Sequence, residues 1–273
     1  MRRVLLAVAI AALLVTAGCS GTSGPATTAT TDATEPTTTP ATTTVGPPEY
    51  PAGVSADGVK NASTLVNAHR AHVVEHGAVL DGVTDTNGTV GNRSVAVDAS
   101  ETAVLSPNAT YLSWTLDGSR TVNGTSETTL DESYWANDSV LVSRVATTGN
   151  VTIRTRNRTG IYDDLVVNAG VKDRVLEAAL SNANYTVAGT EYADGRWLTT
   201  LESVNDTYSG QRPVVEFDAT IVVASSGRVL SMERGWVTET DRSRNRYHDE
   251  FTWSPAEPVE RADWVPVNAS ADT

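Results

Sequence analysis

The sharpest match to a catalytic pattern in this chain is a pair of histidines with a glutamate between them. His72 and His76 are four residues apart, Glu75 precedes His76, and His69 lies one turn earlier. On a helix, two imidazoles at this spacing share one side and could hold zinc, with the glutamate as general base. Such a site needs a third protein ligand, for which Glu177 is the available glutamate. Because short patterns of common residue types recur by accident, we favour histidines at the polar border of a helix, partly covered by a sheet.

Other enzymatic chemistry has little support. The chain has four histidines and one cysteine, and it contains neither a Gly-x-Ser-x-Gly motif nor a glycine-rich phosphate loop. Acidic pairs such as Asp163-Asp164 and Asp249-Glu250 could be imagined as glycosidase carboxylates, but in a chain this acidic we interpret them as solvated surface. We therefore expect no enzyme, no catalytic residue, no metal and no cofactor.

The single cysteine, Cys19, ends the run Leu14-Val15-Thr16-Ala17-Gly18-Cys19, where a hydrophobic stretch beginning at Val4 stops. Two arginines, a short apolar stretch and small residues before the cut are typical of a signal peptide, here residues 1–18. The segment resembles a lipobox, which implies a lipid on the Cys19 sulfur, although Thr16 departs from the usual leucine. Arg2-Arg3 leaves both the twin-arginine and the general export route open.

We expect residues 19–49 to be a lipidated cysteine followed by a disordered tether. Residues 20–49 contain twelve threonines and five prolines, and such a composition cannot bury enough apolar surface to fold. Extended chain of this length would reach at most about 90 Å, enough to cross a cell-surface layer. Clustered threonine and proline are also typical of O-glycosylated stalks.

N-glycosylation signals agree with a location outside the cell. Eleven of the fifteen asparagines precede x-Ser or x-Thr, where roughly three would be expected by chance. A polar, threonine-rich surface would also generate such sequons without glycans. The candidate acceptors are Asn61, Asn87, Asn92, Asn108, Asn123, Asn137, Asn150, Asn157, Asn184, Asn205 and Asn268.

The charge balance excludes one class of partner. The formal net charge is −13, and the only lysines are Lys60 and Lys172. A field of this sign repels nucleic acid, and an acidic, lysine-poor surface is typical of proteins from halophilic archaea. Two arginine clusters, Arg154/Arg156/Arg158 and Arg242/Arg244/Arg246, have alternate spacing, which favours solvated strand edges over a site for an anionic ligand or lipid headgroup.

Residues 50–273 are expected to fold as one α+β domain. Asp57 is a plausible N-cap for a first helix, in which Leu65 and Val73 recur at helical spacing and Gly77 marks the end. A second helical stretch follows Asp163 and Asp164 and ends among Asn182 and Asn184. Strands are predicted at 94–99, 111–116, 140–145, 151–155, 185–191, 197–204, 214–224, 229–238 and 246–253. Short turns between these nine or ten strands favour an antiparallel sheet.

The order of elements carries a family resemblance. The chain has, in order, a lipobox, a linker, a helix, antiparallel strands, a central helical insertion and the hairpin Val222-Val223-Ala224-Ser225-Ser226-Gly227-Arg228-Val229-Leu230-Ser231-Met232. In this order of elements it resembles the LolA/LppX/RseB-type half-barrel lipoproteins and haloarchaeal surface lipoproteins of unassigned role. The resemblance implies a strongly curved sheet with the helices against its concave face and an apolar cavity between them. Trp114, Leu198, Val222, Leu230 and Phe251 are the candidates for lining that cavity.

The leading hypothesis is a non-enzymatic lipoprotein, anchored through Cys19 to the extracellular face of the membrane, that binds or carries a hydrophobic ligand such as a lipid. An envelope interaction or sensor module that binds a partner protein is the first alternative. A zinc-dependent hydrolase using His72 and His76 is the second. Function in this scheme follows from fold analogy, so the site itself must decide between them.

Overall fold

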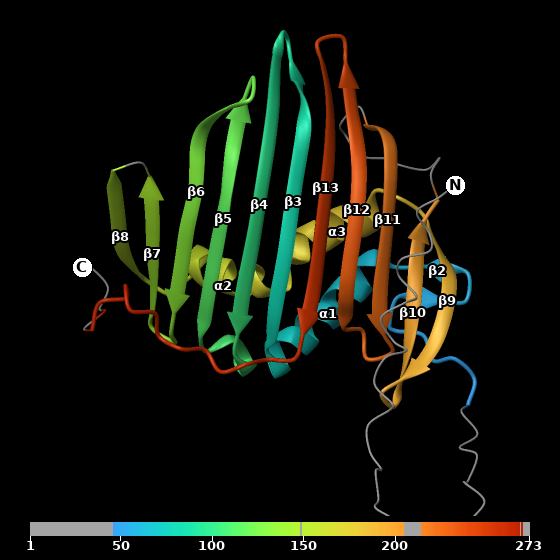
Figure 1. Ribbon diagram of the computed structural model, residues 1–273. Helices are drawn as coiled ribbons and strands as arrows, with labels where there is room; N and C mark the ends of the chain where they lie inside the picture. Colours follow the sequence, from blue (N-terminus) through green and yellow to red (C-terminus); the bar gives the residue numbers. More distant parts are fainter. Residues whose placement is uncertain (1–45, 148, 205–213, 268, 270–273) are drawn as a thin grey trace, which may run out of the picture. The chain divides into compact units, whose positions relative to one another are not determined.

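An eleven-stranded antiparallel sheet dominates the computed structural model, which describes residues 46–147, 149–204, 214–267 and 269 (Figure 1). The described residues belong to one compact unit, Val45–Thr273. The predicted signal peptide, Cys19 and nearly all of the tether fall outside them.

Neighbouring strands of the sheet are consecutive in the sequence, with one exception at the centre of the sheet. Their order is β8-β7-β6-β5-β4-β3-β13-β12-β11-β10-β9, so the last strand pairs with the first one, and the edge strands β8 and β9 do not pair with each other. The sheet is therefore open. The strands are β3 Ala78–Val90, β4 Arg93–Leu105, β5 Leu112–Val122, β6 Thr125–Ala136, β7 Val140–Thr147, β8 Asn150–Asn157, β9 Tyr185–Ala193, β10 Arg196–Ser203, β11 Val214–Ala224, β12 Val229–Thr240 and β13 Ser243–Ser254.

The strand number exceeds the predicted nine or ten. The sequence patterns missed β3 and β6, and a separate two-stranded sheet, β1 Val54–Ser55 with β2 Gly58–Val59, precedes the first helix. β3 carries Asp, Asn and Gly, which are poor strand formers, and β6 carries mostly Thr, Ser, Glu and Asp, whose polar side chains are weak evidence of burial.

The helices differ from the predictions at two points. Helix α1 (Ala62–His76) begins after Asn61, whose Oδ1 accepts a hydrogen bond from the Thr64 N–H, so Asp57 is not its cap. Gly77 ends it as predicted. The second helical region is two helices, α2 (Ile161–Val171) and α3 (Asp173–Ser181), separated at Lys172, whose φ of 57° and ψ of 33° break the helical path. A short 3₁₀ turn, η1 (Pro107–Ala109), follows β4.

All three helices pack on one side of the sheet, here called the inner face (Figure 1). Strand pairing aligns one inner-face row across seven strands: Leu201, Ile221, Met232, Phe251, Gly82, Glu101 and Leu116. Because side chains alternate along a strand, the residues directly before and after each member of this row point to the opposite side of the sheet, here called the outer face. A shift of one residue in the pairing register of a strand would move its inner-face side chains to the outer face. The register of this row therefore determines which face of the sheet is apolar.

The main hydrophobic core lies between the helices and the inner face. Leu65 and Val73 of α1 and Leu176 of α3 are fully buried against Leu80 and Leu105 of the sheet. Each such side chain stabilises the fold by roughly 1.5–3 kcal/mol. Gly82 belongs to this packing, since a Cβ at its position would lie 2.6 Å from the Phe251 ring. The Phe251 ring therefore lies across β3 at the position where Gly82 has no side chain.

A second, smaller core lies on the outer face. After β13 the chain passes along one end of the sheet, and Val265 packs against Trp135, Val140 and Val142 of β6 and β7 (Figure 1). Arg261 holds this segment by donating to the Val265 carbonyl oxygen at 2.8 Å. The C-terminal segment therefore covers apolar side chains that the helices do not reach.

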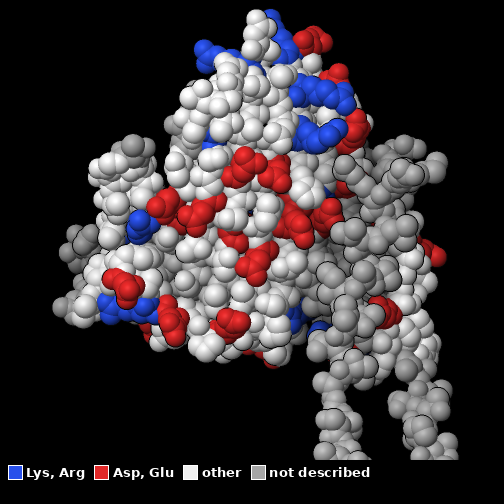
Figure 2. Space-filling model, viewed as in Figure 1, with Lys and Arg blue, Asp and Glu red and all other residues white. Residues whose placement is uncertain are grey.

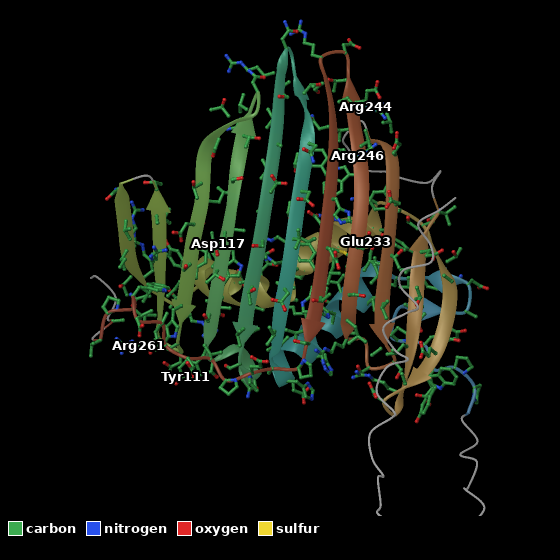
Figure 3. All side chains as sticks on the ribbon, viewed as in Figure 1. Tyr111, Asp117, Glu233, Arg244, Arg246 and Arg261 are labelled. Carbon is green, nitrogen blue, oxygen red and sulfur yellow. The ribbon has the colours of Figure 1, made fainter. Side chains whose placement is uncertain are left out.

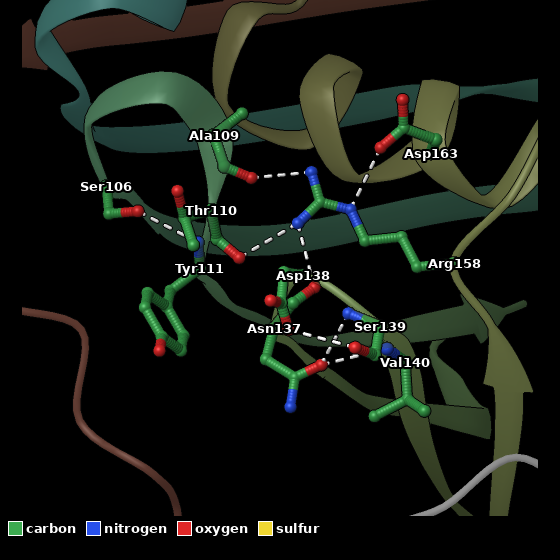
Figure 4. Close-up of polar contacts among 10 residues, drawn as sticks. All are labelled: Ser106, Ala109, Thr110, Tyr111, Asn137, Asp138, Ser139, Val140, Arg158 and Asp163. Atoms are coloured by element: carbon green, nitrogen blue, oxygen red, sulfur yellow. Dashed lines mark hydrogen bonds and ion pairs between the residues drawn. The ribbon is translucent and has the colours of Figure 1, made fainter.

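Arg158, just beyond β8, joins three loops at the same end of the sheet (Figure 4). Its guanidinium donates to the carbonyl oxygens of Ala109 at 2.5 Å, Thr110 at 2.9 Å and Asn137 at 2.8 Å. It also pairs with Asp163, in the first turn of α2, at 2.9 Å. The Arg158 side chain is 7% exposed, so it is a buried cross-link and not the solvated edge residue that its spacing predicted.

None of the described helices is long and apolar enough to span a bilayer.

Candidate functional site

The inner face extends beyond the helices. In Figure 1 the helices lie behind the lower half of the sheet, and no helix lies behind the upper parts of β3, β4, β5, β12 and β13. There the inner-face rows carry half-buried apolar and aromatic side chains, in contrast to the full burial below. We call this surface the open region and define it as Val95, Val97, Leu116, Leu130, Trp236 and Tyr247.

Aromatic stacking forms one side of the open region. Trp236 and its cross-strand neighbour Tyr247 stack with ring centroids 4.8 Å apart and an interplanar angle of 7°. Arg234 lies with its guanidinium carbon 4.7 Å from the Trp236 centroid and forms an ion pair with Asp249 at 2.5 Å. Both charged groups are thereby satisfied, and the rings are fixed in place.

A second ion pair lies at the lower border of the open region. Lys172 Nζ donates to Glu101 Oε2 at 2.6 Å, and the Trp114 Nε1–H donates to the same oxygen at 2.8 Å. Lys172 can reach the sheet because it sits at the break between α2 and α3. With Arg234 and Asp249, this pair compensates the charges at the lower border of the open region, while Arg120 and Glu132 lie on the same face, directly opposite Val97 and Leu116.

The predicted cavity residues do not share one face. Trp114 and Phe251 belong to the main core on the inner face, with exposed fractions of 9% and 3%. Val222 lies between the buried inner-face residues Ile221 and Val223 and therefore points to the outer face. Leu198 and Leu230 are half-buried and belong to neither of the two hydrophobic clusters found among the described residues. Val222 therefore does not share a face with Trp114 and Phe251, while a cavity lined by these residues stays a prediction.

The three histidines of α1 have different surroundings. His69 is fully buried: its Nδ1 accepts from the Val229 N–H at 3.0 Å, and its Nε2 donates to the Val171 carbonyl oxygen at 3.1 Å. Burial lowers the pKa of His69 to about 3, so the ring is neutral. His72 is half-buried and His76 is exposed, and their rings stack 4.4 Å apart.

No third ligand joins His72 and His76. Within the described part of the chain, no group of three or more His, Cys, Asp and Glu side chains is arranged to hold a metal ion, and Glu177 is not part of such a group. His76 Nδ1 is instead 3.0 Å from the His72 carbonyl oxygen, a contact within the helix. The arrangement of these residues supplies two imidazoles and no completed zinc site.

Carboxylates gather on the outer face, as Figure 2 shows over the centre of the sheet. Strand pairing places three like-charged pairs directly opposite each other: Glu233 with Glu250, Asp85 with Asp98, and Asp117 with Asp131. Figure 3 shows Asp117 and Glu233 on this face. Two open hollows of 430 and 310 Å³ lie among these residues, and Val83 and Ser100 line both. Carboxylate residues line both hollows, and neither is an enclosed cavity.

The second arginine cluster is not at a sheet edge. Arg244 and Arg246 belong to β13, which pairs with strands on both sides, so the expected edge position is wrong (Figure 3). Arg244 instead lies on the acidic outer face, where it pairs with Glu216 at 2.7 Å and with Glu239. In the first cluster, Arg154 and Arg156 do lie on an edge strand, β8.

The sequons within the described residues are all at the surface. Eight of the nine asparagines are exposed and Asn137 is half-buried, while Asn205 and Asn268 lie outside the described residues. Several also shape turns: Asn123 Oδ1 accepts from the Ser94 N–H at 3.0 Å, and Asn137 Oδ1 accepts from the N–H groups of Ser139 and Val140 at 2.8 Å (Figure 4). Turn formation alone therefore explains part of the asparagine excess.

No family model matches the sequence, and no curated protein matches it. Among solved structures, the chain is similar to LprF from Mycobacterium bovis, with 14% identity, coverage of 77% of this chain and 97% of that chain, and a TM-score of 0.33. It is also similar to an outer membrane lipoprotein-sorting protein domain from Vibrio parahaemolyticus (8% identity, coverage 71% and 93%, TM-score 0.23). A LolA superfamily protein from Nitrosomonas europaea matches at 8% identity, with coverage of 73% and 94% and a TM-score of 0.19. TM-scores of this size do not establish a common fold, so the assignment of function depends on the open region itself.

Proposed function

We propose that the chain is a non-enzymatic, lipid-anchored cell-surface protein of a halophilic archaeon and that its open region binds an apolar ligand such as a lipid chain. One observation carries the ligand proposal: apolar and aromatic side chains continue along the inner face beyond the helices that bury the rest of it. Val95, Val97, Leu116 and Leu130 line three adjacent strands there, and Trp236 and Tyr247 close one side. An apolar surface of this kind, next to a closed core, is typical of ligand or partner contacts.

The anchoring part of the proposal depends on Cys19. A lipid on its sulfur, followed by the threonine- and proline-rich tether, would hold residues 50–273 outside the cell and close to the bilayer from which a lipid could be taken. Membrane retention of the wild-type chain and its loss in Cys19→Ser would support this. A Cys19→Ser chain that is processed and retained as before would contradict it.

The ligand proposal is tested by native mass spectrometry of the chain purified without detergent. We expect a bound lipid on the wild-type protein and its loss in Val97→Asp, which puts a charge into the open region. Ala96→Asp is the matched control, because it adds the same charge to the other face of the same strand. Equal lipid content in the two variants would place the ligand elsewhere.

A specific observation also favours the partner-binding alternative. β8 is an edge strand, paired among the described strands only with β7, and its Val151 and Ile153 are 55% and 43% exposed. An extended segment of another protein could add to this edge by backbone hydrogen bonds. Cross-linking that captures one envelope protein from wild-type cells but not from an Ile153→Pro strain would support this alternative.

A further inference from the structure

The end of the sheet near α1 contains two arginines that lack the carboxylate partners found elsewhere in this acidic chain. Arg228, in the hairpin between β11 and β12, is 7% exposed, and among the described residues its guanidinium donates one hydrogen bond, from Nη2 to the Trp253 carbonyl oxygen at 3.0 Å. Its Nε is buried without a hydrogen-bond partner, and so is the Nε of Arg196 at the start of β10. Among the described residues, neither guanidinium has a carboxylate at ion-pair distance.

The fold brings these arginines close to the stacked pair of His72 and His76. The Ser225 N–H donates to the Trp197 carbonyl oxygen at 2.8 Å, which places the hairpin turn beside the residue that follows Arg196. On the other side the turn touches α1, since a Cβ at Gly227 would lie 2.6 Å from the Ala68 Cβ. Ala68 is one helical turn before His72 on the same face of α1.

The electrostatics of this group agree with its geometry. Besides burial and the neighbouring His76, the positive charges of Arg228 and Arg196 lower the pKa of His72, and Glu75 acts in the opposite direction. Burial lowers the pKa of Arg228, and the charge of Arg196 lowers it further. Burying a guanidinium without a counter-charge is unfavourable, and an anion would remove that penalty.

We propose that Arg196, Arg228 and His72 form a binding site for a phosphate-type oxyanion. The two arginines supply Nε–H donors with no partner among the described residues, and His72 supplies a further donor when protonated. The ligand is either free phosphate or the phosphate of a lipid headgroup, which share this chemistry. The site is separate from the open region, so it holds whether or not the open region binds a lipid.

Thermal unfolding of the full-length chain tests the site. Sodium phosphate should raise the wild-type Tm by about 5 °C over sodium chloride at equal ionic strength. The shift should be lost in Arg196→Gln and reduced in His72→Gln, and it should persist in the matched control Arg174→Gln, which removes an exposed arginine on α3. Arg196 is only half-buried, so its variant is testable even if Arg228→Gln fails to fold.

Two further ligands separate the sources of phosphate. Glycerol 3-phosphate, which carries no acyl chains, should give the same shift if free phosphate compounds suffice. A shift given by phosphatidylglycerol vesicles, but by neither soluble phosphate, would identify a headgroup. No shift with any of these phosphates, or an equal shift in Arg196→Gln, would overturn the proposal.

Discussion

The His69 Nδ1 accepts the backbone N–H of Val229 at 3.0 Å, although the two residues are 160 positions apart. With the bond from Nε2 to the Val171 carbonyl oxygen, one imidazole ties α1 to both α2 and β12. Its ring also meets Trp253 edge-on at 5.0 Å. A residue that could be taken as a metal ligand is therefore part of the core.

The pKa of His69 predicts acid sensitivity. The folded state holds the ring neutral down to about pH 3, whereas the unfolded chain takes up a proton below about pH 6.5. The contribution of this group is therefore complete above pH 6.5 and declines as the pH falls to 3, by about 1.4 kcal/mol per pH unit. Urea unfolding of wild-type and His69→Gln between pH 7 and 4 measures it. A wild-type pH profile that is no steeper than that of the variant would contradict the assignment.

Arg158 should contribute to stability through the loops that it joins. Arg158→Gln removes three hydrogen bonds to carbonyl oxygens and the ion pair with Asp163, and we expect a loss of about 2–4 kcal/mol in the free energy of unfolding. Arg154→Gln is the control, because that arginine is exposed on β8. Denaturant unfolding checks the difference, and equal stability of the two variants would show that the cross-link is not needed.

The like-charged pairs of the outer face predict stabilisation by salt. Glu233 and Glu250 face each other across β12 and β13, and such a pair destabilises a sheet by roughly 0.2–1 kcal/mol at low ionic strength. Potassium chloride screens this repulsion, so Tm should rise with its concentration. Glu233→Gln should stabilise the protein in low salt and weaken the salt dependence.

The control for this prediction is Glu257→Gln, which removes an exposed carboxylate from the segment after β13. It should change the salt dependence less than Glu233→Gln does. A Tm that does not change between low and high salt would remove the physical support for a high-salt habitat.

The sequence predicted the antiparallel sheet, the end of α1 at Gly77 and nine of the strands, because alternation and turn residues are local signals. It missed β3, where Asp81 and Asp85 lie on the outer face and Gly82 makes room for Phe251. That glycine is explained only by a residue from the opposite end of the chain. Likewise, nothing near Lys172 in the sequence indicates that it breaks a helix to reach Glu101.

The candidate site was predicted less well than the fold. Which face of a strand is covered depends on register and on where the helices end, so Val222 could not be separated from Trp114 and Phe251. The open region was missed for the same reason. Val95 and Val97 alternate with Ala96 and Asp98, which indicates a two-faced strand without showing which part of it the helices leave uncovered.

The central claim is tested most directly by titrating the chain with Nile red, a neutral apolar dye, and measuring its fluorescence. The account predicts saturable binding to the wild-type protein and to Ala96→Asp, and at least tenfold weaker binding to Val97→Asp, because the added carboxylate would have to be desolvated on the open region. Equal affinity for all three proteins, or no saturable binding to the wild-type chain, would contradict it.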